Sequence, residues 1–179
     1  MSSRNRLMLP LTLLFYVAIS SAQAPRGPNL EVQREAMQKL AFLAGKWSGE
    51  AKGTRGPGAA FKVQQTEEIQ YKLDGLVMLI EGAGRDPETK KVMFSALATV
   101  SYDDAAKSYR FRAYNNGNYL DTELKVSENG FEWSFPAGPF TVKNAMRLNA
   151  EGDWVETTDV SSGDNPPRRT MEMTVRKGK

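Results

Sequence analysis

The chain has 179 residues, with 24 Lys and Arg against 21 Asp and Glu, and it contains neither His nor Cys. The absence of these two residue types excludes disulfides, thiol redox chemistry and the Ser–His and Cys–His pairs of nucleophilic enzymes. It also removes the usual ligands of zinc and the usual proximal ligand of haem. We therefore expect no metal and no cofactor, name no catalytic residue, and lean toward a protein that is not an enzyme.

The first 22 residues have the composition of a secretory signal peptide. Arg4 and Arg6 precede an uncharged, mainly apolar run over residues 7–19, and small residues follow as far as Ala24. This order is typical of a signal peptide, and the run is short for crossing a bilayer, which takes about 20 residues. We expect cleavage after Ala22, export to the periplasm or the cell exterior, and no stable membrane anchor afterwards. An uncleaved anchor is the alternative.

Removing residues 1–22 leaves 22 basic against 21 acidic residues, a net charge of +1. Because the remaining charges are nearly balanced and interspersed, we expect no nucleic-acid partner. Residues 23–29 are rich in Pro and Gly and are interpreted as a flexible leader. Residues 30–179 then suit a single domain with its own core.

One helix is predicted at the start of this domain. Asn29 is a suitable N-cap, residues 31–44 place Val32, Leu40 and others near one face, and Gly45 follows as a stop signal.

Beyond this helix, short alternating segments are separated by turn residues, which indicates about ten antiparallel strands. No helix remains to cover a second sheet face, so a meander of this length protects its edges by closing on itself. We predict an all-β fold, a closed antiparallel up-and-down β-barrel with a short N-terminal helix; a two-sheet sandwich is the alternative. The expected strands cover 47–54, 61–73, 76–84, 92–102, 108–114, 119–126, 131–135, 140–148, 154–160 and 169–177.

The segment Gly45-x-Trp47, between the helix and the first strand, resembles the opening of lipocalin-like (calycin) barrels. In those proteins the Trp lies at the base of the barrel, and a basic residue near the end of the last strand packs across it. The resemblance assigns that role to Arg176, as a cation–π contact that closes the barrel.

More closely, the chain resembles a bacterial family of uncharacterised lipocalin-like barrels, a domain of unknown function, over residues 38–177. The similar segments are 43–47, 71–75, 81–89 and 109–114. This resemblance implies the barrel fold and no settled activity. Nitrobindin-like haem barrels are more distantly similar, but they hold haem through a His that this chain lacks. Fatty-acid-binding barrels are also distantly similar.

Arg110, Arg112 and Tyr114 share one face of their strand, whereas Tyr109 and Phe111 share the other. If the polar face points inward, two guanidinium groups and a phenol could clamp a carboxylate, as in fatty-acid-binding barrels. If the apolar face points inward, both arginines lie outside and pair with acidic residues of the next strand. The strand register decides between the two, and burial of the aromatic residues is the favoured alternative.

Five further residues are candidates for the ligand-binding site. Glu67 and Tyr71 lie on the same face of their strand as apolar neighbours, so they are candidates to point into the barrel. A carboxylate inside the barrel must be paired or protonated. The alternative is that Glu67 is exposed to water. Met78, Phe94 and Trp133 belong to a set of soft and aromatic side chains that either line a cavity or form plain core. A barrel of ten strands is wider than side chains readily fill, which favours the cavity.

We therefore predict an exported barrel that binds a small hydrophobic or amphipathic molecule in its interior. One alternative is an isomerase or hydrolase of a lipid-like substrate that uses carboxylate, Tyr and Arg groups; it requires an acid such as Glu67 beside Arg110 or Arg112. The other alternative is a structural or interaction protein of the cell envelope whose barrel is filled.

Overall fold

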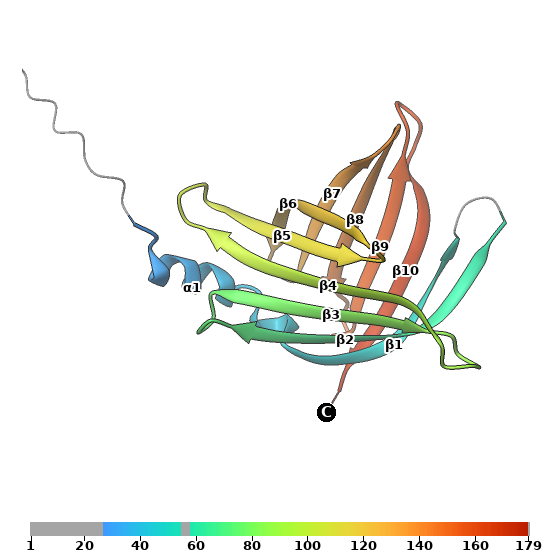
Figure 1. Cartoon of the computed structure of the whole chain (residues 1–179), viewed down its shortest axis with the longest axis horizontal. Coiled ribbons are helices and arrows are strands. Elements are labelled where there is room, and N and C mark those ends of the chain that lie inside the picture. The colour runs from blue at the N-terminus through green and yellow to red at the C-terminus, as the bar shows by residue number, and fades with distance from the viewer. Residues whose placement is uncertain (1–26, 55–57, 179) are drawn as a thin grey trace, which may run out of the picture.

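The computed structural model of the chain describes residues 27–54 and 58–178, so the predicted signal peptide and most of the leader lie outside the described residues. Ten strands form one closed barrel in which each strand is antiparallel to its neighbours and β10 pairs with β1 (Figure 1). The predicted fold is therefore confirmed, and the sandwich is excluded. The strands are β1 (Gly45–Thr54), β2 (Ala60–Lys72), β3 (Val77–Arg85), β4 (Val92–Asp103), β5 (Ser108–Asn115), β6 (Asn118–Ser127), β7 (Gly130–Ala137), β8 (Phe140–Leu148), β9 (Trp154–Ser161) and β10 (Arg168–Lys177).

The N-terminal helix is shorter than predicted. Helix α1 covers Leu30–Gln38, with the side chain of Asn29 accepting a hydrogen bond from the backbone N–H of Val32, and a separate 3-10 turn covers Ala41–Leu43. The break turns Leu40 and Leu43 into the barrel, where both are buried, while Val32 stays exposed. Within the described residues, no helix has the length and apolar character needed to cross a membrane.

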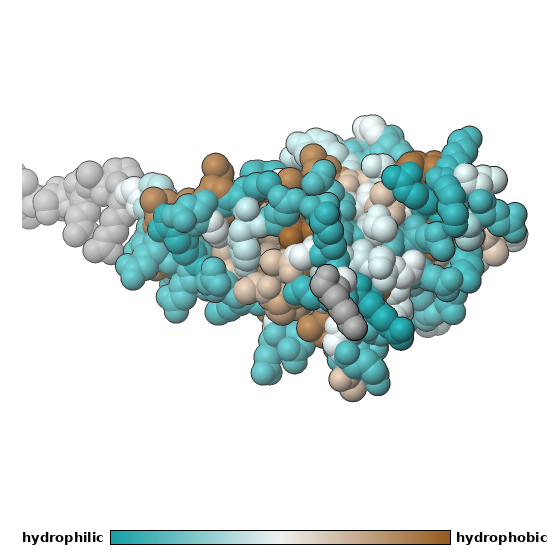
Figure 2. Space-filling view, turned by 90° about the horizontal axis from the view of Figure 1, so that it is seen from below, coloured by the Kyte–Doolittle hydropathy of each residue, from teal (hydrophilic) through white to brown (hydrophobic). Residues whose placement is uncertain are grey.

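The alternation of side chains along each strand separates an apolar interior from a charged exterior. In β2, Val63 and Ile69 are buried, whereas Lys62 is exposed and pairs with Glu50 of β1 across the outer face. Figure 2 shows that the outer surface seen from below is largely hydrophilic, with small apolar areas scattered over it.

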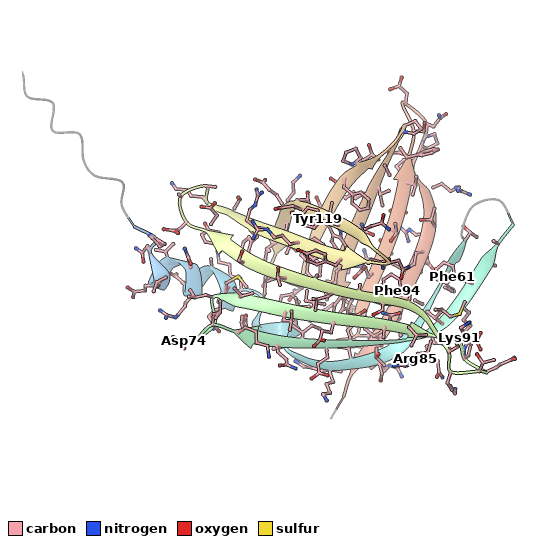
Figure 3. The ribbon with its side chains drawn as sticks, viewed as in Figure 1. Phe61, Asp74, Arg85, Lys91, Phe94 and Tyr119 are labelled. Atoms are coloured by element: carbon pink, nitrogen blue, oxygen red, sulfur yellow. The ribbon has the colours of Figure 1, made fainter. Side chains whose placement is uncertain are left out.

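The two ends of the barrel differ. The turn at Asp74, between β2 and β3, lies at the same end as α1, whereas Phe61, Phe94 and the turn between Arg85 and Lys91 lie toward the opposite end (Figure 3). The end at α1 is closed, because side chains of the helix and the 3-10 turn enter it.

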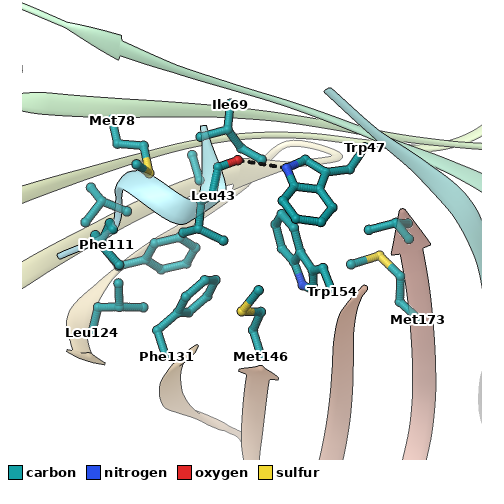
Figure 4. Close-up of a cluster of buried hydrophobic side chains, with 14 of the residues drawn as sticks. Leu43, Trp47, Ile69, Met78, Phe111, Leu124, Phe131, Met146, Trp154 and Met173 are labelled. Carbon is teal, nitrogen blue, oxygen red and sulfur yellow. Dashed lines mark hydrogen bonds between the residues drawn. The ribbon is translucent and has the colours of Figure 1, made fainter. Parts of the chain in front are cut away.

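Hydrogen bonds hold α1 and the 3-10 turn at this end of the barrel. The indole N–H of Trp47 donates to the backbone carbonyl of Leu43 at 2.7 Å (Figure 4). The hydroxyls of Tyr71 and Tyr109 donate to the backbone carbonyls of Met37 and Ala36 at 2.6 and 2.7 Å. These three bonds join the end of α1 and the following turn to β1, β2 and β5.

One seam of the barrel is short. Strands β6 and β7 are joined by three residue pairs next to their hairpin, Lys125–Glu132 to Ser127–Gly130. Farther along, the side chain of Thr122 donates to the carbonyl of Ser134 at 3.1 Å. Each other neighbouring pair of strands is joined by seven or more residue pairs. The wall of the barrel is thus least closed between these two strands.

Candidate functional site

The half of the barrel away from α1 is hollow. A cavity of about 760 Å³ occupies it, a volume in the range of small-molecule sites. Its walls are mainly apolar and aromatic, and they extend to the short seam between β6 and β7. The apolar lining includes Val63, Ile80, Phe94, Phe111, Leu120, Trp133, Phe135, Met171 and Met173.

A small polar cluster lies at the inner end of this cavity, next to the core. On β2, the side-chain amide of Gln65 donates to Oε1 of Glu67 at 2.7 Å. On β9, Glu156 accepts a hydrogen bond from the indole N–H of Trp154 at 3.1 Å through Oε2. We call Gln65, Glu67, Glu156, Asn144 and Thr158 the polar cluster; the last two are joined by a hydrogen bond of 2.7 Å.

Glycines on β3 make room for the β2 part of this cluster. Gly82 pairs with Glu67 and Gly84 pairs with Gln65 across the two strands. A Cβ atom at Gly82 would lie 2.7 Å from Oε2 of Glu67, and one at Gly84 would lie 2.9 Å from Oε1 of Gln65. The missing side chains therefore leave the space that the amide and the carboxyl occupy.

Both carboxyl groups of the cluster hold their protons more tightly than ordinary glutamates do. Burial raises the pKa of Glu67 to about 7, against the opposing effect of the hydrogen bond from Gln65. Burial, with the charge of Glu67 as a second cause, raises the pKa of Glu156 to about 8. Glu156 keeps some accessible surface, and it lines the cavity.

Aromatic rings separate the cavity from the closed end. The rings of Phe111 and Trp133 lie 5.0 Å apart, and Phe131 stacks on Trp133 at 5.6 Å. Trp154 continues the row, with its ring 6.2 Å from Phe131 and 5.8 Å from Trp47. This row forms a firm inner wall, since such contacts add to the stabilisation that burial provides.

Three of the residues predicted from the sequence line the cavity: Glu67, Phe94 and Trp133. Two others belong to the closed end instead. Met78 is fully buried in the core that includes Leu40 and Leu43, and the Tyr71 hydroxyl bonds to the helix. Both side chains point into the barrel, as the alternation predicts. They pack in the core at the closed end and do not line the cavity.

Arg110, Arg112 and Tyr114 lie on the outer wall. Because Phe111 is buried inside, the period of two sends its neighbours outward. Both arginines pair with Asp121 of β6, at 3.2 and 3.0 Å, and the exposed ring of Tyr114 lies 5.4 Å from that of Tyr119. The predicted carboxylate clamp does not form. The enzyme alternative that required these arginines beside Glu67 loses its basis.

The closure of the barrel also differs from the expectation. Trp47 is buried as expected, but the ammonium of Lys177, not the guanidinium of Arg176, lies over its ring at 5.3 Å from the centroid. Arg176 is on the opposite phase of β10 and pairs outside with Asp153 at 3.1 Å. Gly45, with φ of 128°, allows this arrangement, since a Cβ there would lie 2.9 Å from Cε of Lys177.

Glu156, Asn144 and Thr158 were not predicted as site residues from the sequence. Glu156 and Thr158 share the phase of Trp154, so an inward Trp on that strand would have indicated that both point inside. Within the described residues, no group of three or more acidic side chains is placed to hold a metal ion.

Comparisons with known proteins give the fold alone. No protein-family model matches the chain, and no curated protein matches it. Among solved structures, the crystal structure of Rv2717c from M. tuberculosis is similar, with a TM-score of 0.60 at 10% sequence identity. The similarity covers 80% of this chain and 98% of that one. The chain therefore shares its barrel architecture with Rv2717c.

Proposed function

We propose that this protein binds a small apolar or amphipathic molecule in the interior of its barrel. The observation that carries the proposal is the cavity of about 760 Å³, whose lining is mainly apolar and aromatic and includes the two glutamates Glu67 and Glu156 among a smaller number of polar groups. Ligand sites in proteins commonly combine these features, since apolar walls supply affinity and a few polar groups fix orientation. The cavity also favours this function over a filled barrel with a purely structural role.

We propose in addition that the protein is exported, on the strength of residues 1–22. The test is N-terminal sequencing of the chain recovered from the periplasm or the culture medium of an expressing bacterium. We expect a chain that begins at Gln23. Recovery only from the cytoplasm, with Met1 or Ser2 retained, would contradict export.

Binding is tested with the neutral fluorophore N-phenyl-1-naphthylamine and with native mass spectrometry of the purified protein. We expect fluorescence enhancement on binding, and a small molecule carried through purification. Trp133 and Trp154 line the cavity, so their own emission provides a second signal that does not depend on the probe.

A pair of variants on β4 locates the binding site. Ala98 faces the cavity and Leu97, its neighbour, is exposed on the outer wall. Ala98→Phe fills the cavity and should weaken probe binding about tenfold or more, whereas Leu97→Phe should leave it within about twofold. If the folded wild-type protein binds no probe and yields no extractable molecule, the proposed function is wrong.

A further inference from the structure

Among the described residues, the lining of the cavity includes acidic groups and no basic ones. Glu67 and Glu156 are the carboxyl groups in its described lining, and no Lys or Arg is among the described residues there. The other titratable side chain in the lining is Tyr119, whose hydroxyl bonds to Asp121 on the outer side. Neither glutamate takes part in an ion pair within the described part of the chain.

The two carboxyl groups keep atoms available for a ligand. Each accepts one hydrogen bond through one oxygen, which leaves Oε2 of Glu67 and Oε1 of Glu156 without a protein partner among the described residues. The described residues contain a single fully buried side-chain polar atom that lacks a partner, the hydroxyl of Ser108. The two carboxyl oxygens therefore retain accessible surface, and both residues line the cavity.

The indole of Trp154 lies beside Glu156 and begins a row of aromatic rings. Trp154 bonds directly to Glu156, and Phe131 and Trp133 extend the aromatic row along the inner wall. The faces of such rings attract cations, most strongly where water is excluded. Carboxyl groups and aromatic faces at one end of an apolar cavity together match an organic ammonium group.

We propose that the ligand of this cavity is an amphipathic amine, with its ammonium group between Glu67 and Glu156 and its apolar part filling the remainder. The inference rests on the proposed binding function and specifies the chemistry of the ligand. An ammonium donates hydrogen bonds to the open carboxyl oxygens and supplies the positive charge that the lining lacks. A fatty-acid carboxylate would instead bring a negative charge to an end of the cavity where no described cation could meet it.

Proton release provides a signature of this binding mode. Burial keeps both glutamates largely protonated near pH 6, since it raises the pKa of Glu67 to about 7 and that of Glu156 to about 8. A cation beside a carboxyl group favours its ionised form. Binding of an amine at about pH 6 should therefore release about one proton, whereas binding of a neutral alcohol should release none. Calorimetry in two buffers of different ionisation enthalpy measures this number.

The affinity test uses three ligands that have the same number of carbon atoms and differ in their polar group: decylamine, decan-1-ol and decanoate. Each is used to displace N-phenyl-1-naphthylamine at about pH 7. We expect decylamine to act at a concentration at least about tenfold lower than decan-1-ol, and decanoate to be the weakest. Direct calorimetric titration with decylamine checks the result without the probe.

Variants assign the preference to the two carboxyl groups. Glu67→Gln and Glu156→Gln keep the side-chain shape and break no ion pair of the described residues, and each should reduce the amine preference; the double variant should abolish it. Glu68→Gln is the matched control, because Glu68 is the next residue on β2 and pairs on the outer face with Lys46. It should retain the preference in full.

The outcomes separate the two proposals. If the fluorophore binds but the three ligands displace it equally, or decanoate does so best, the amine inference is overturned and the binding function stands. The inference is equally overturned if the double variant keeps the full preference for decylamine. If neither the fluorophore nor decylamine binds to the folded protein, the binding function fails and the inference fails with it.

Discussion

The stability of this barrel should fall as the pH rises through the neutral range, because of Glu67 and Glu156. In the unfolded chain both carboxyls lose their protons near pH 4.5, whereas in the barrel burial raises the pKa of Glu67 to about 7 and that of Glu156 to about 8. Between these values the folded state binds more protons than the unfolded state, so raising the pH favours unfolding. The stabilisation is fully present below pH 4.5 and is lost as each folded-state pKa is passed.

The composition makes this effect easy to isolate. The chain has no His and no Cys, so ordinary side chains contribute little titration between pH of about 5.5 and 8. In that pH range the folded state holds protons that the unfolded state has lost. Each such proton lowers the free energy of unfolding by about 1.4 kcal/mol per pH unit. For Glu67 the interval from 4.5 to about 7 corresponds to about 3 kcal/mol in total.

The perturbation is Glu67→Gln, which removes the titrating group and also the charge that raises the pKa of Glu156. At about pH 4 the variant and the wild type should be equally stable, and at about pH 8 the variant should be more stable by as much as about 3 kcal/mol. The assay is urea unfolding followed by Trp fluorescence across this range at constant ionic strength. Glu68→Gln, on the outer face, should follow the wild-type curve.

Two results would refute the reasoning. A wild-type stability that is flat between pH of about 5.5 and 8 would show that neither glutamate is buried as described. A Glu67→Gln variant that loses stability as steeply as the wild type would show that Glu67 is not the titrating group.

Three further predictions concern positions whose roles the structure distinguishes. Gly49→Ala should destabilise the barrel by about 3 kcal/mol or more in urea unfolding, because its Cβ would lie 2.1 Å from a backbone oxygen of β10; Gly82→Ala, which meets only the movable end of a side chain, should cost about 1 kcal/mol or less. Tyr71→Phe and Tyr109→Phe each remove a hydrogen bond to α1 and should each cost about 1 kcal/mol, with faster amide exchange in the helix. Arg112→Ala, on the outer wall, should leave fluorophore binding unchanged within about twofold.

Much of the fold could be predicted because its causes are local. The alternation between 61 and 73 followed by Asp74 and Gly75 predicts a strand and a sharp turn, and β2 does end at Lys72 with left-handed residues after it. Successive short strands with no covering helix predict closure, which β1 and β10 accomplish. The break in the helix after Gln38 was not predicted, since it depends on how Leu40 and Leu43 enter the end of the barrel.

What the sequence by itself determined is therefore the set of strands, their turns, the absence of His and Cys chemistry, and the two possible faces of each strand. Only the tertiary structure decided which face of β5 points inward, because alternation leaves both phases open until the strand is paired, and it placed Arg112 outside. Likewise, Glu67 on β2 and Glu156 on β9 meet only through closure of the barrel, since β1 and β10 lie between their strands. Closure brings them near enough for the charge of Glu67 to raise the pKa of Glu156, and no pattern within either strand predicts this.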